Sequence, residues 1–280
     1  MITKTKSSTG FEYIEIENNS ATAKIALQGA HLLHYQQHDT PPLLWLSEKS
    51  HLESGKAIRG GIPICWPWFG KHSEDAALPQ HGFARTALFS LLEAKETDED
   101  TTELLLQLRS SVETLAFWPY EFEILVQITV GPTLTVALTT RNCDTKPFTI
   151  TSALHSYFSV SHISNVSVQG LDKAEYWDSL TDKNKIQHGD IYISEEVDRV
   201  YQKVKDELTL QDRDRTIKIS TKGSSSAVVW NPWSDKSKRM DDMQANAYET
   251  MLCIETANAL ADAQDLAPGE EHTLQCSFCS

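Results

Sequence analysis

The sequence predicts an all-β fold, and three observations support this expectation. Residues 122–130 and 134–138 alternate apolar and polar side chains, and Gly131-Pro132 separates the two runs. A period of two is typical of half-buried strands, and a glycine–proline pair marks a turn, so the runs are expected to form a β-hairpin. Many other short apolar runs are separated by polar turns, whereas helical signals are sparse. This pattern favours a large sandwich or barrel.

Ten further segments have weaker strand signals of the same kind. The acidic stretch 93–103 is expected to be a solvated loop between two strands, which could together form a hairpin. Residues 111–117 are expected to form one or two helical turns, and residues 241–249 a short helix. In chain order, the ten strand candidates are residues 12–17, 23–27, 104–108, 148–152, 166–169, 208–210, 216–220, 227–230, 251–254 and 273–278.

The length and composition predict one globular domain that spans residues 1–280. Of the 280 residues, 40% are hydrophobic and 23% are charged, which suffices for a sizeable core. No linker is evident, and all-β sandwiches reach this size as single domains. The net charge of −14 disfavours nucleic acid, whose protein partners usually have a basic face. Any phosphate would therefore need a local cationic site.

The cysteines and the lack of long apolar runs predict a cytoplasmic protein. The five cysteines are odd in number and lack the spacing of a disulfide framework. Cys276 and Cys279 could form a thiol switch or half a zinc site, but no second pair completes four ligands, so reduced thiols in or near a terminal strand are expected. No run approaches the roughly 20 apolar residues that span a membrane, and no signal peptide is evident.

Two segments rich in glycine and proline give the strongest signal for ligand binding. Residues 58–63 read IRGGIP, and residues 79–85 read PQHGFAR. Such segments are not helix interiors, and their glycines let the backbone approach a ligand closely. Arg59 and Arg85 each offer a planar fork of donors that binds carboxylate or phosphate.

His155 and Glu255 form a candidate acid–base pair. His155 follows the strand-like run 148–154, where a lone histidine is more often a core residue. Glu255 comes just after the apolar run 251–254, and a glutamate is almost never buried without a partner. Together the two side chains suit acid–base chemistry on a small anionic substrate. In the productive complex we expect ionised Glu255 and protonated His155.

The other histidines allow more than one interpretation. Gln80 and His81 could contact sugar hydroxyls or tie their loop to neighbouring strands. His31, His34 and His38 begin where a turn leads into a strand, and their spacing does not place them on one face, so no metal site is expected. No Walker loop, dinucleotide fingerprint or nucleophile-elbow serine is present, so no cofactor is expected.

Taken together, these segments resemble the hexose-6-phosphate mutarotases of the aldose 1-epimerase superfamily. The resemblance follows the family's order over nearly the whole chain. It implies a β-supersandwich, the galactose mutarotase-like arrangement of large twisted antiparallel sheets, with the site in a cleft on one face. The matching segments are 29–32 (GAHL), 58–63 (IRGGIP), 80–85 (QHGFAR), 154–158 (LHSYF), 198–201 (DRVY), 229–233 (VWNPW), Asp242 and 253–255 (CIE).

The resemblance also implies a reaction, the interconversion of the α and β anomers of aldohexose 6-phosphates, chiefly glucose 6-phosphate. His155 would be the general acid toward the ring oxygen, and Glu255 the base toward the anomeric hydroxyl. Asp242 matches a family position but receives no firm role. The reaction needs no metal and no cofactor, and we expect a monomer that binds neither nucleic acid nor membrane.

Five further residues would bind the substrate in this interpretation. Arg59 and Arg85 would hold the phosphate, while Gln80, His81 and Asp198 would contact or orient the sugar. Two unpaired guanidiniums would be costly in the cleft of a neutral-sugar mutarotase, so a sugar phosphate is preferred.

Two other functions remain open at this point. A non-catalytic carbohydrate or sugar-phosphate binding protein could have the same fold, but it would not need both His155 and Glu255. A glycoside hydrolase would require two carboxylates, which Asp198 or Asp242 could supply together with Glu255. The two arginines would then have no evident purpose.

Overall fold

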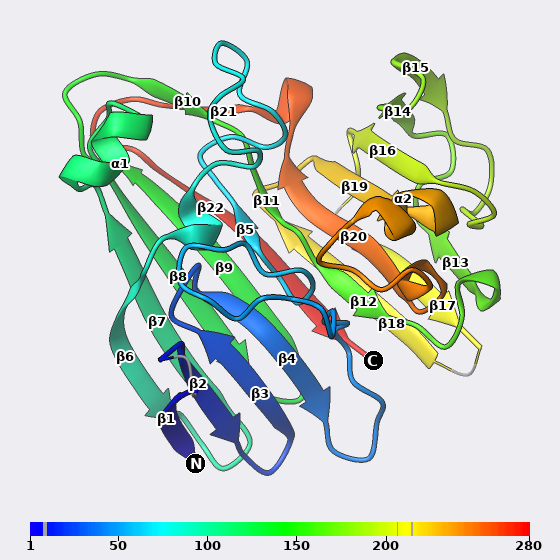
Figure 1. Cartoon of the computed structure of the whole chain (residues 1–280), viewed down its shortest axis with the longest axis horizontal. Helices are drawn as coiled ribbons and strands as arrows, with labels where there is room; N and C mark the ends of the chain where they lie inside the picture. The colour runs from blue at the N-terminus through cyan, green and yellow to red at the C-terminus, as the bar shows by residue number, and fades with distance from the viewer. Residues whose placement is uncertain (8–9, 206, 214) are drawn as a thin grey trace.

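The structure, a computed structural model, describes residues 1–7, 10–205, 207–213 and 215–280 and confirms the all-β prediction (Figure 1). Two eight-stranded antiparallel sheets dominate, and a four-stranded and a two-stranded sheet complete the fold. Within these described ranges, the α-helices are the short α1 (Val112–Phe117) and α2 (Trp233–Arg239). Neither is long and apolar enough to cross a membrane.

The first eight-stranded sheet contains the hairpin that the alternating sequence predicts. Residue Ile124 of one strand pairs with Thr140 of the other, and the inward-facing residues of both strands are buried. The strand order is β13 (Val166–Gln169), β17 (Glu207–Asp212), β18 (Arg215–Lys222), β22 (Glu271–Cys279), β9 (Leu134–Asn142), β8 (Phe122–Val130), β7 (Thr102–Arg109) and β6 (Ser90–Glu96).

The second eight-stranded sheet surrounds β20, in which every residue is buried. Buried on both faces, β20 has the continuous apolar run of a central strand. The strand order is β15 (Lys183–Ile186), β14 (Glu175–Asp178), β16 (Val197–Gln202), β19 (Ser226–Asn231), β20 (Met251–Asn258), β11 (Ser152–Leu154) and β5 (Ile64–Cys65), while β12 (Tyr157–Ser159) also pairs with β20.

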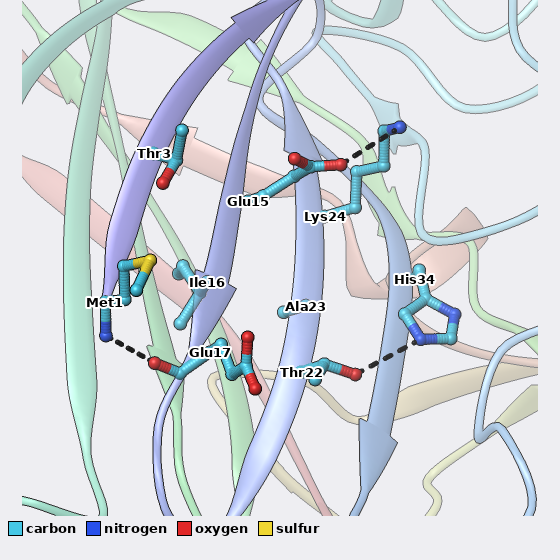
Figure 2. A pocket seen from close by; sticks show the side chains of 9 residues that line it. All are labelled: Met1, Thr3, Glu15, Ile16, Glu17, Thr22, Ala23, Lys24 and His34. Carbon is cyan, nitrogen blue, oxygen red and sulfur yellow. Dashed lines mark hydrogen bonds and ion pairs between the residues drawn. The ribbon is translucent and has the colours of Figure 1, made fainter.

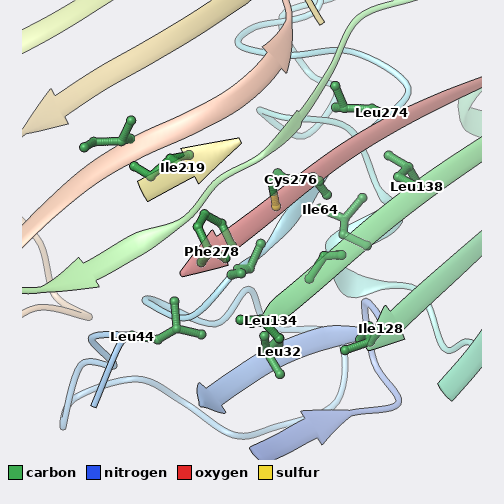
Figure 3. Close-up of a cluster of buried hydrophobic side chains, with 14 of the residues drawn as sticks. Leu32, Leu44, Ile64, Ile128, Leu134, Leu138, Ile219, Leu274, Cys276 and Phe278 are labelled. Carbon is green, nitrogen blue, oxygen red and sulfur yellow. The ribbon is translucent and has the colours of Figure 1, made fainter. Parts of the chain in front are cut away.

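The main core lies where the sheets face one another. Figure 3 shows side chains from the N-terminal sheet and both large sheets in one cluster, among them Leu32, Ile64, Leu138 and Phe278. The smaller sheets are the four-stranded β1 (Ile2–Lys6), β2 (Glu12–Glu17), β3 (Ala21–Ala26) and β4 (His31–Gln37), and the pair β10 (Phe148–Ile150) and β21 (Gln264–Leu266).

All ten strand candidates overlap observed strands, although some boundaries need correction, and the hairpin expected at residues 93–103 is present. The run 148–152 is split between β10 and β11, because the two parts pair with different strands. The acidic stretch 93–103 is a loop only at residues 97–101, since β6 ends at Glu96 and β7 begins at Thr102. Its outer acidic residues belong to a hairpin.

The helix predicted at residues 241–249 is wrong, whereas the prediction at 111–117 is confirmed by α1. Residues 241–246 form turns and bends, followed by the single 3-10 turn η3 (Ala247–Glu249). Tertiary contacts use the polar groups of this segment, because the Ser47 hydroxyl donates to the Asp242 carbonyl at 2.6 Å. The helix in this region is α2, which follows Pro232.

Candidate active site

A cavity of about 540 Å³ opens on the second eight-stranded sheet. Strands β16, β19 and β20, the β11–β12 junction, helix α2 and the loops before η1 (Ala84–Thr86) contribute to its walls. All seven residues that the sequence proposed for the site line this one cavity: Arg59, Gln80, His81, Arg85, His155, Asp198 and Glu255.

His155 and Glu255 lie opposite each other because two short strands flank the histidine and both pair with β20. Leu154 of β11 pairs with Thr256, and Tyr157 of β12 pairs with Cys253. This register brings His155 Nε2 to 3.3 Å from Glu255 Oε1, with side chains only 11% and 1% exposed. The sequence placed Glu255 just after a strand, and the structure places it inside β20.

Burial controls the protonation of this pair. Desolvation, followed by the electrostatic interactions with His81 and with the charged Arg59 and Arg85, lowers the pKa of His155 well below its usual value. Desolvation, with the nearby carboxylate of Asp198, raises the pKa of Glu255 well above its usual value. The substrate-free site therefore favours neutral histidine and protonated glutamic acid, the reverse of the ionised pair expected for the productive complex.

The neutral pair and the ionised pair have the same total number of protons. They differ only in whether one proton resides on Glu255 or on His155, and the 3.3 Å contact joins the two atoms that would exchange it. The buried Nδ1 of His155 and Oε2 of Glu255 have no hydrogen-bond partner in the part of the chain that the structure describes. The pair therefore retains unused hydrogen-bonding capacity.

Arg59 is held by two protein partners, contrary to the expectation of two unpaired guanidiniums. Its Nε donates to Oδ2 of Asp242 at 3.1 Å, and its Nη2 forms an ion pair with the same oxygen at 3.0 Å. Its Nη1 donates to the Tyr157 hydroxyl at 2.9 Å. A guanidinium has five N–H donors, so donors remain on both terminal nitrogens. Although burial works against the charge, Tyr157 and Asp242 raise the pKa of Arg59.

Arg85 differs from Arg59 because it forms no ion pair with any described residue. Its Nη2 donates to the backbone carbonyl of Gln80 at 2.7 Å. The side chain of Gln80 itself is exposed. The Arg85 guanidinium is therefore the arginine of the site whose charge is not balanced by a carboxylate.

His81 ties its loop to the adjacent one, which is the structural alternative left open by the sequence. Its Nδ1 accepts from the Gly70 amide at 3.2 Å, and its ring lies 5.0 Å from that of Phe69 and 6.0 Å from that of His155. Burial and the charges of Arg85 and Arg59 lower the pKa of His81 to about 3. The side chain is neutral, and it also lines the cavity.

Asp198 enters the cavity from β16 and lies close to a lysine that the sequence did not single out. Lys236 Nζ lies 4.0 Å from Asp198 Oδ2 and 2.9 Å from Glu196 Oε1. Burial raises the pKa of Asp198, while Ser179 and Lys236 counteract that change. Lys236 lies on α2, so an interpretation that missed this helix could not find it.

Two aromatic residues of the site, Tyr157 and Trp230, received no role from the sequence. Tyr157 is buried and stacks on His155, with ring centroids 4.7 Å apart and an interplanar angle of 10°. Trp230 lines the cavity, and its ring lies edge-on to His155 at 6.1 Å. The sequence did contain a signal for the role of Tyr157, because this tyrosine follows His155 by only two residues.

Comparison with known proteins identifies the family. The family model described as aldose 1-epimerase matches residues 12–279. The chain belongs to the aldose 1-epimerase family. A protein of Cenchrus ciliaris is 37% identical over 98% of this chain and 88% of its own, and one of Escherichia coli K12 is 37% identical over 89% and 83%. Both are named "Putative glucose-6-phosphate 1-epimerase".

Solved structures agree with this membership of the aldose 1-epimerase family. A "putative mutarotase" from Salmonella typhimurium superimposes with a TM-score of 0.93 at 33% identity, covering 99% of this chain and 92% of that one. A "galactose mutarotase related enzyme" from Lactobacillus acidophilus gives 0.75 at 15% identity, covering 95% and 96%, and supports the fold alone. The galactose mutarotase-like fold expected from the sequence is confirmed.

Proposed function

We propose that this epimerase interconverts the α and β anomers of aldohexose 6-phosphates, chiefly D-glucose 6-phosphate. The observation that carries the proposal is the buried pair of His155 and Glu255, 3.3 Å apart in a cavity that two arginines also line. Anomerisation requires an acid and a base that act on two oxygens of one sugar ring, and this pair supplies both.

The proposed reaction opens and recloses a hemiacetal. Glu255 removes the proton from O1 while His155 donates one to O5, and the ring opens to the aldehyde. Rotation about the C1–C2 bond exposes the other face of the carbonyl, and reclosure gives the other anomer. The step needs ionised Glu255 and protonated His155, which form when the shared proton moves from Glu255 to His155. The reverse reaction restores both groups, so no net proton is consumed.

The preference for a phosphorylated sugar rests on the cations of the cavity. The unbalanced charge of Arg85 would remain unpaired with a neutral sugar, whereas a phosphate pairs with it. Arg59 still has N–H donors on its terminal nitrogens beyond its bonds to Asp242 and Tyr157, and Lys71 also lines the cavity. This cluster is local, because the whole chain has a net charge of −14. The names of the two relatives at 37% identity agree with this substrate class.

The main alternative is a non-catalytic sugar-phosphate binding protein on the same fold. Such a protein would gain nothing from a buried histidine and glutamate in contact, because keeping ionisable groups away from water is costly. The monomeric state, the single domain over residues 1–280 and the cytoplasmic location remain predictions.

An anomerisation assay with purified protein tests the proposal. Glucose 6-phosphate, glucose and galactose would each be added as a single anomer, and the approach to equilibrium would be followed by polarimetry. We expect the highest kcat/KM with glucose 6-phosphate. No acceleration with any sugar would favour the binding protein, and a preference for free galactose would exclude the sugar-phosphate proposal.

A further inference from the structure

We propose that Tyr157 is a positioning residue that couples phosphate binding at Arg59 to the catalytic histidine. In this view the phosphate of the substrate increases the rate of proton transfer at the distant anomeric centre, in addition to increasing affinity. The inference rests on the proposed function and deepens it, because it explains how a group remote from the reacting atoms would select the substrate.

The ring of Tyr157 is packed among three other aromatic rings. It is 1% exposed and stacks on His155 at 4.7 Å. Trp45 stacks on it at 5.9 Å with an interplanar angle of 24°, and Trp230 packs edge-on at 6.0 Å. The orientation of the His155 ring therefore depends on where this tyrosine lies.

The hydroxyl of Tyr157 joins this aromatic stack to the arginine. It accepts a hydrogen bond from Arg59 Nη1 at 2.9 Å. A backbone hydrogen bond also links the two segments, because the Tyr157 amide donates to the carbonyl of Gly61, two residues from Arg59, at 2.9 Å. A shift of the Arg59 guanidinium on phosphate binding would therefore reach the surface on which His155 rests.

Electrostatics act in the same direction as this geometry. After burial and His81, the charges of Arg59 and Arg85 contribute to the lowered pKa of His155. A phosphate dianion bound at these arginines would offset their charge and raise the pKa of the histidine again. Phosphate would thus favour protonated His155, the form that donates to the ring oxygen.

This coupling predicts that phosphate need not be attached to the sugar. Inorganic phosphate that occupies the arginine site should accelerate the anomerisation of free glucose, because it would orient and charge His155 without contributing to sugar binding. A site in which phosphate serves only as an anchor would give no such activation.

The test compares the wild type with Tyr157→Phe, which keeps the ring and removes the hydroxyl. Tyr35→Phe is the matched control, because Tyr35 is also buried and its hydroxyl donates to the Gly131 carbonyl at 2.7 Å. For each protein, kcat and KM are measured with glucose 6-phosphate and with glucose, and glucose turnover is repeated with added inorganic phosphate. The unfolding midpoint is recorded alongside.

We expect Tyr157→Phe to lower kcat for glucose 6-phosphate about tenfold, the order of one hydrogen bond to a charged group, with little change in KM. Turnover of glucose alone should fall less than that of glucose 6-phosphate, and its activation by phosphate should be lost. Tyr35→Phe should match the wild type in every kinetic constant.

Three outcomes would overturn the inference: an effect of Tyr157→Phe on KM alone, equal losses of kcat on both sugars, or wild-type glucose turnover that phosphate does not accelerate. The third readout needs no variant once the rate at which phosphate itself anomerises glucose, measured without protein, is subtracted, so it decides the question even if Tyr157→Phe does not fold. Wild-type protein that accelerates no sugar, or that prefers free sugar, would instead refute the proposed function.

Discussion

In the part of the chain that the structure describes, a second hollow is lined by histidine, glutamate and a cation like the cavity of His155, but it lacks the properties of an active site. The second hollow lies on the outer face of the β1–β4 sheet, where Figure 2 shows Glu15 extended toward Lys24 and His34 toward Thr22. Its volume is about 350 Å³, compared with about 540 Å³ for the cavity of His155. Size and residue type therefore do not distinguish the two.

Solvent exposure does distinguish them. In the outer hollow, Lys24 and Glu15 lie 3.5 Å apart with side chains 31% and 49% exposed, so water and salt screen their charges. In the cavity, His155 and Glu255 are almost entirely buried, and desolvation moves their pKa values in opposite directions. The comparison teaches that burial, rather than residue type, gives His155 and Glu255 their shifted pKa values.

The largest expected effect is a loss of kcat when His155 is replaced but not when His34, the histidine of the outer hollow, is replaced. His155→Ala should lower kcat for glucose 6-phosphate about 10²–10⁴-fold, the usual contribution of a general acid or base. His34→Ala should leave it unchanged, because the His34 side chain contacts Thr22 at 3.5 Å in the outer hollow and does not line the cavity of His155. NMR exchange spectroscopy between the anomers measures both rates. Near-normal exchange in a folded His155→Ala protein would remove the histidine from the mechanism.

The next prediction concerns His31, a buried histidine outside the cavity, and its effect on the pH dependence of stability. His31 is fully buried, bonds the Gly60 carbonyl at 2.7 Å, and burial lowers its pKa from 6.5 to about 4. The unfolded chain therefore binds more protons, and stability should fall as the pH drops from 6.5 toward 4. The shift corresponds to up to about 3 kcal/mol.

Urea unfolding of the wild type and His31→Gln would measure this loss. His34→Gln serves as a comparison variant rather than a blank control, because burial and Lys24 lower the pKa of His34 as well. At about pH 7 and about pH 4.5, His31→Gln should show the flatter pH dependence of the free energy of unfolding. Equal pH dependence in the wild type and His31→Gln would mean that the buried His31 is not the acid-sensitive group.

The smallest of these effects concerns the cations of the two hollows. Arg85→Ala should lower kcat/KM for glucose 6-phosphate about 10- to 100-fold, since charge-assisted hydrogen bonds are worth about 1.5–3 kcal/mol. Glucose turnover should change little, and Lys24→Ala should affect neither sugar. Steady-state kinetics on both substrates provide the check. Equal losses on the two sugars would indicate that Arg85 supports the fold or the chemistry.

The sequence predicted local features of the molecule well. The alternation in β8 and β9 survives because neighbouring residues alone determine which face is buried. Arg59, Arg85 and His155 were recognised from their motifs and do line one cavity. Their proposed roles still depend on the experiments above.

Features that depend on contacts distant in sequence could not be predicted. Asp242 neutralises Arg59 from 183 positions away, which no spacing rule reveals. Lys236 was missed because the short α2 has little periodicity. The opposite pKa shifts of His155 and Glu255 follow from burial by strands that are joined only in the folded protein. Sequence motifs named these groups but not their environments.

The central claim is that the buried pair carries the reaction, and Glu255→Gln tests it most directly. Because burial raises the pKa of Glu255, the folded state holds its proton more tightly, and the associated stability is lost as the pH rises above the unfolded value of 4.5. A neutral glutamine avoids this cost, so the variant should unfold at neutral pH no more easily than the wild type.

The measurement is NMR exchange between the anomers of glucose 6-phosphate with Glu255→Gln, together with its unfolding midpoint. We predict a protein at least as stable as the wild type whose catalysed exchange is about 10²–10⁴-fold slower, because glutamine cannot accept the O1 proton. A folded Glu255→Gln protein that exchanges the anomers at nearly the wild-type rate would contradict the account.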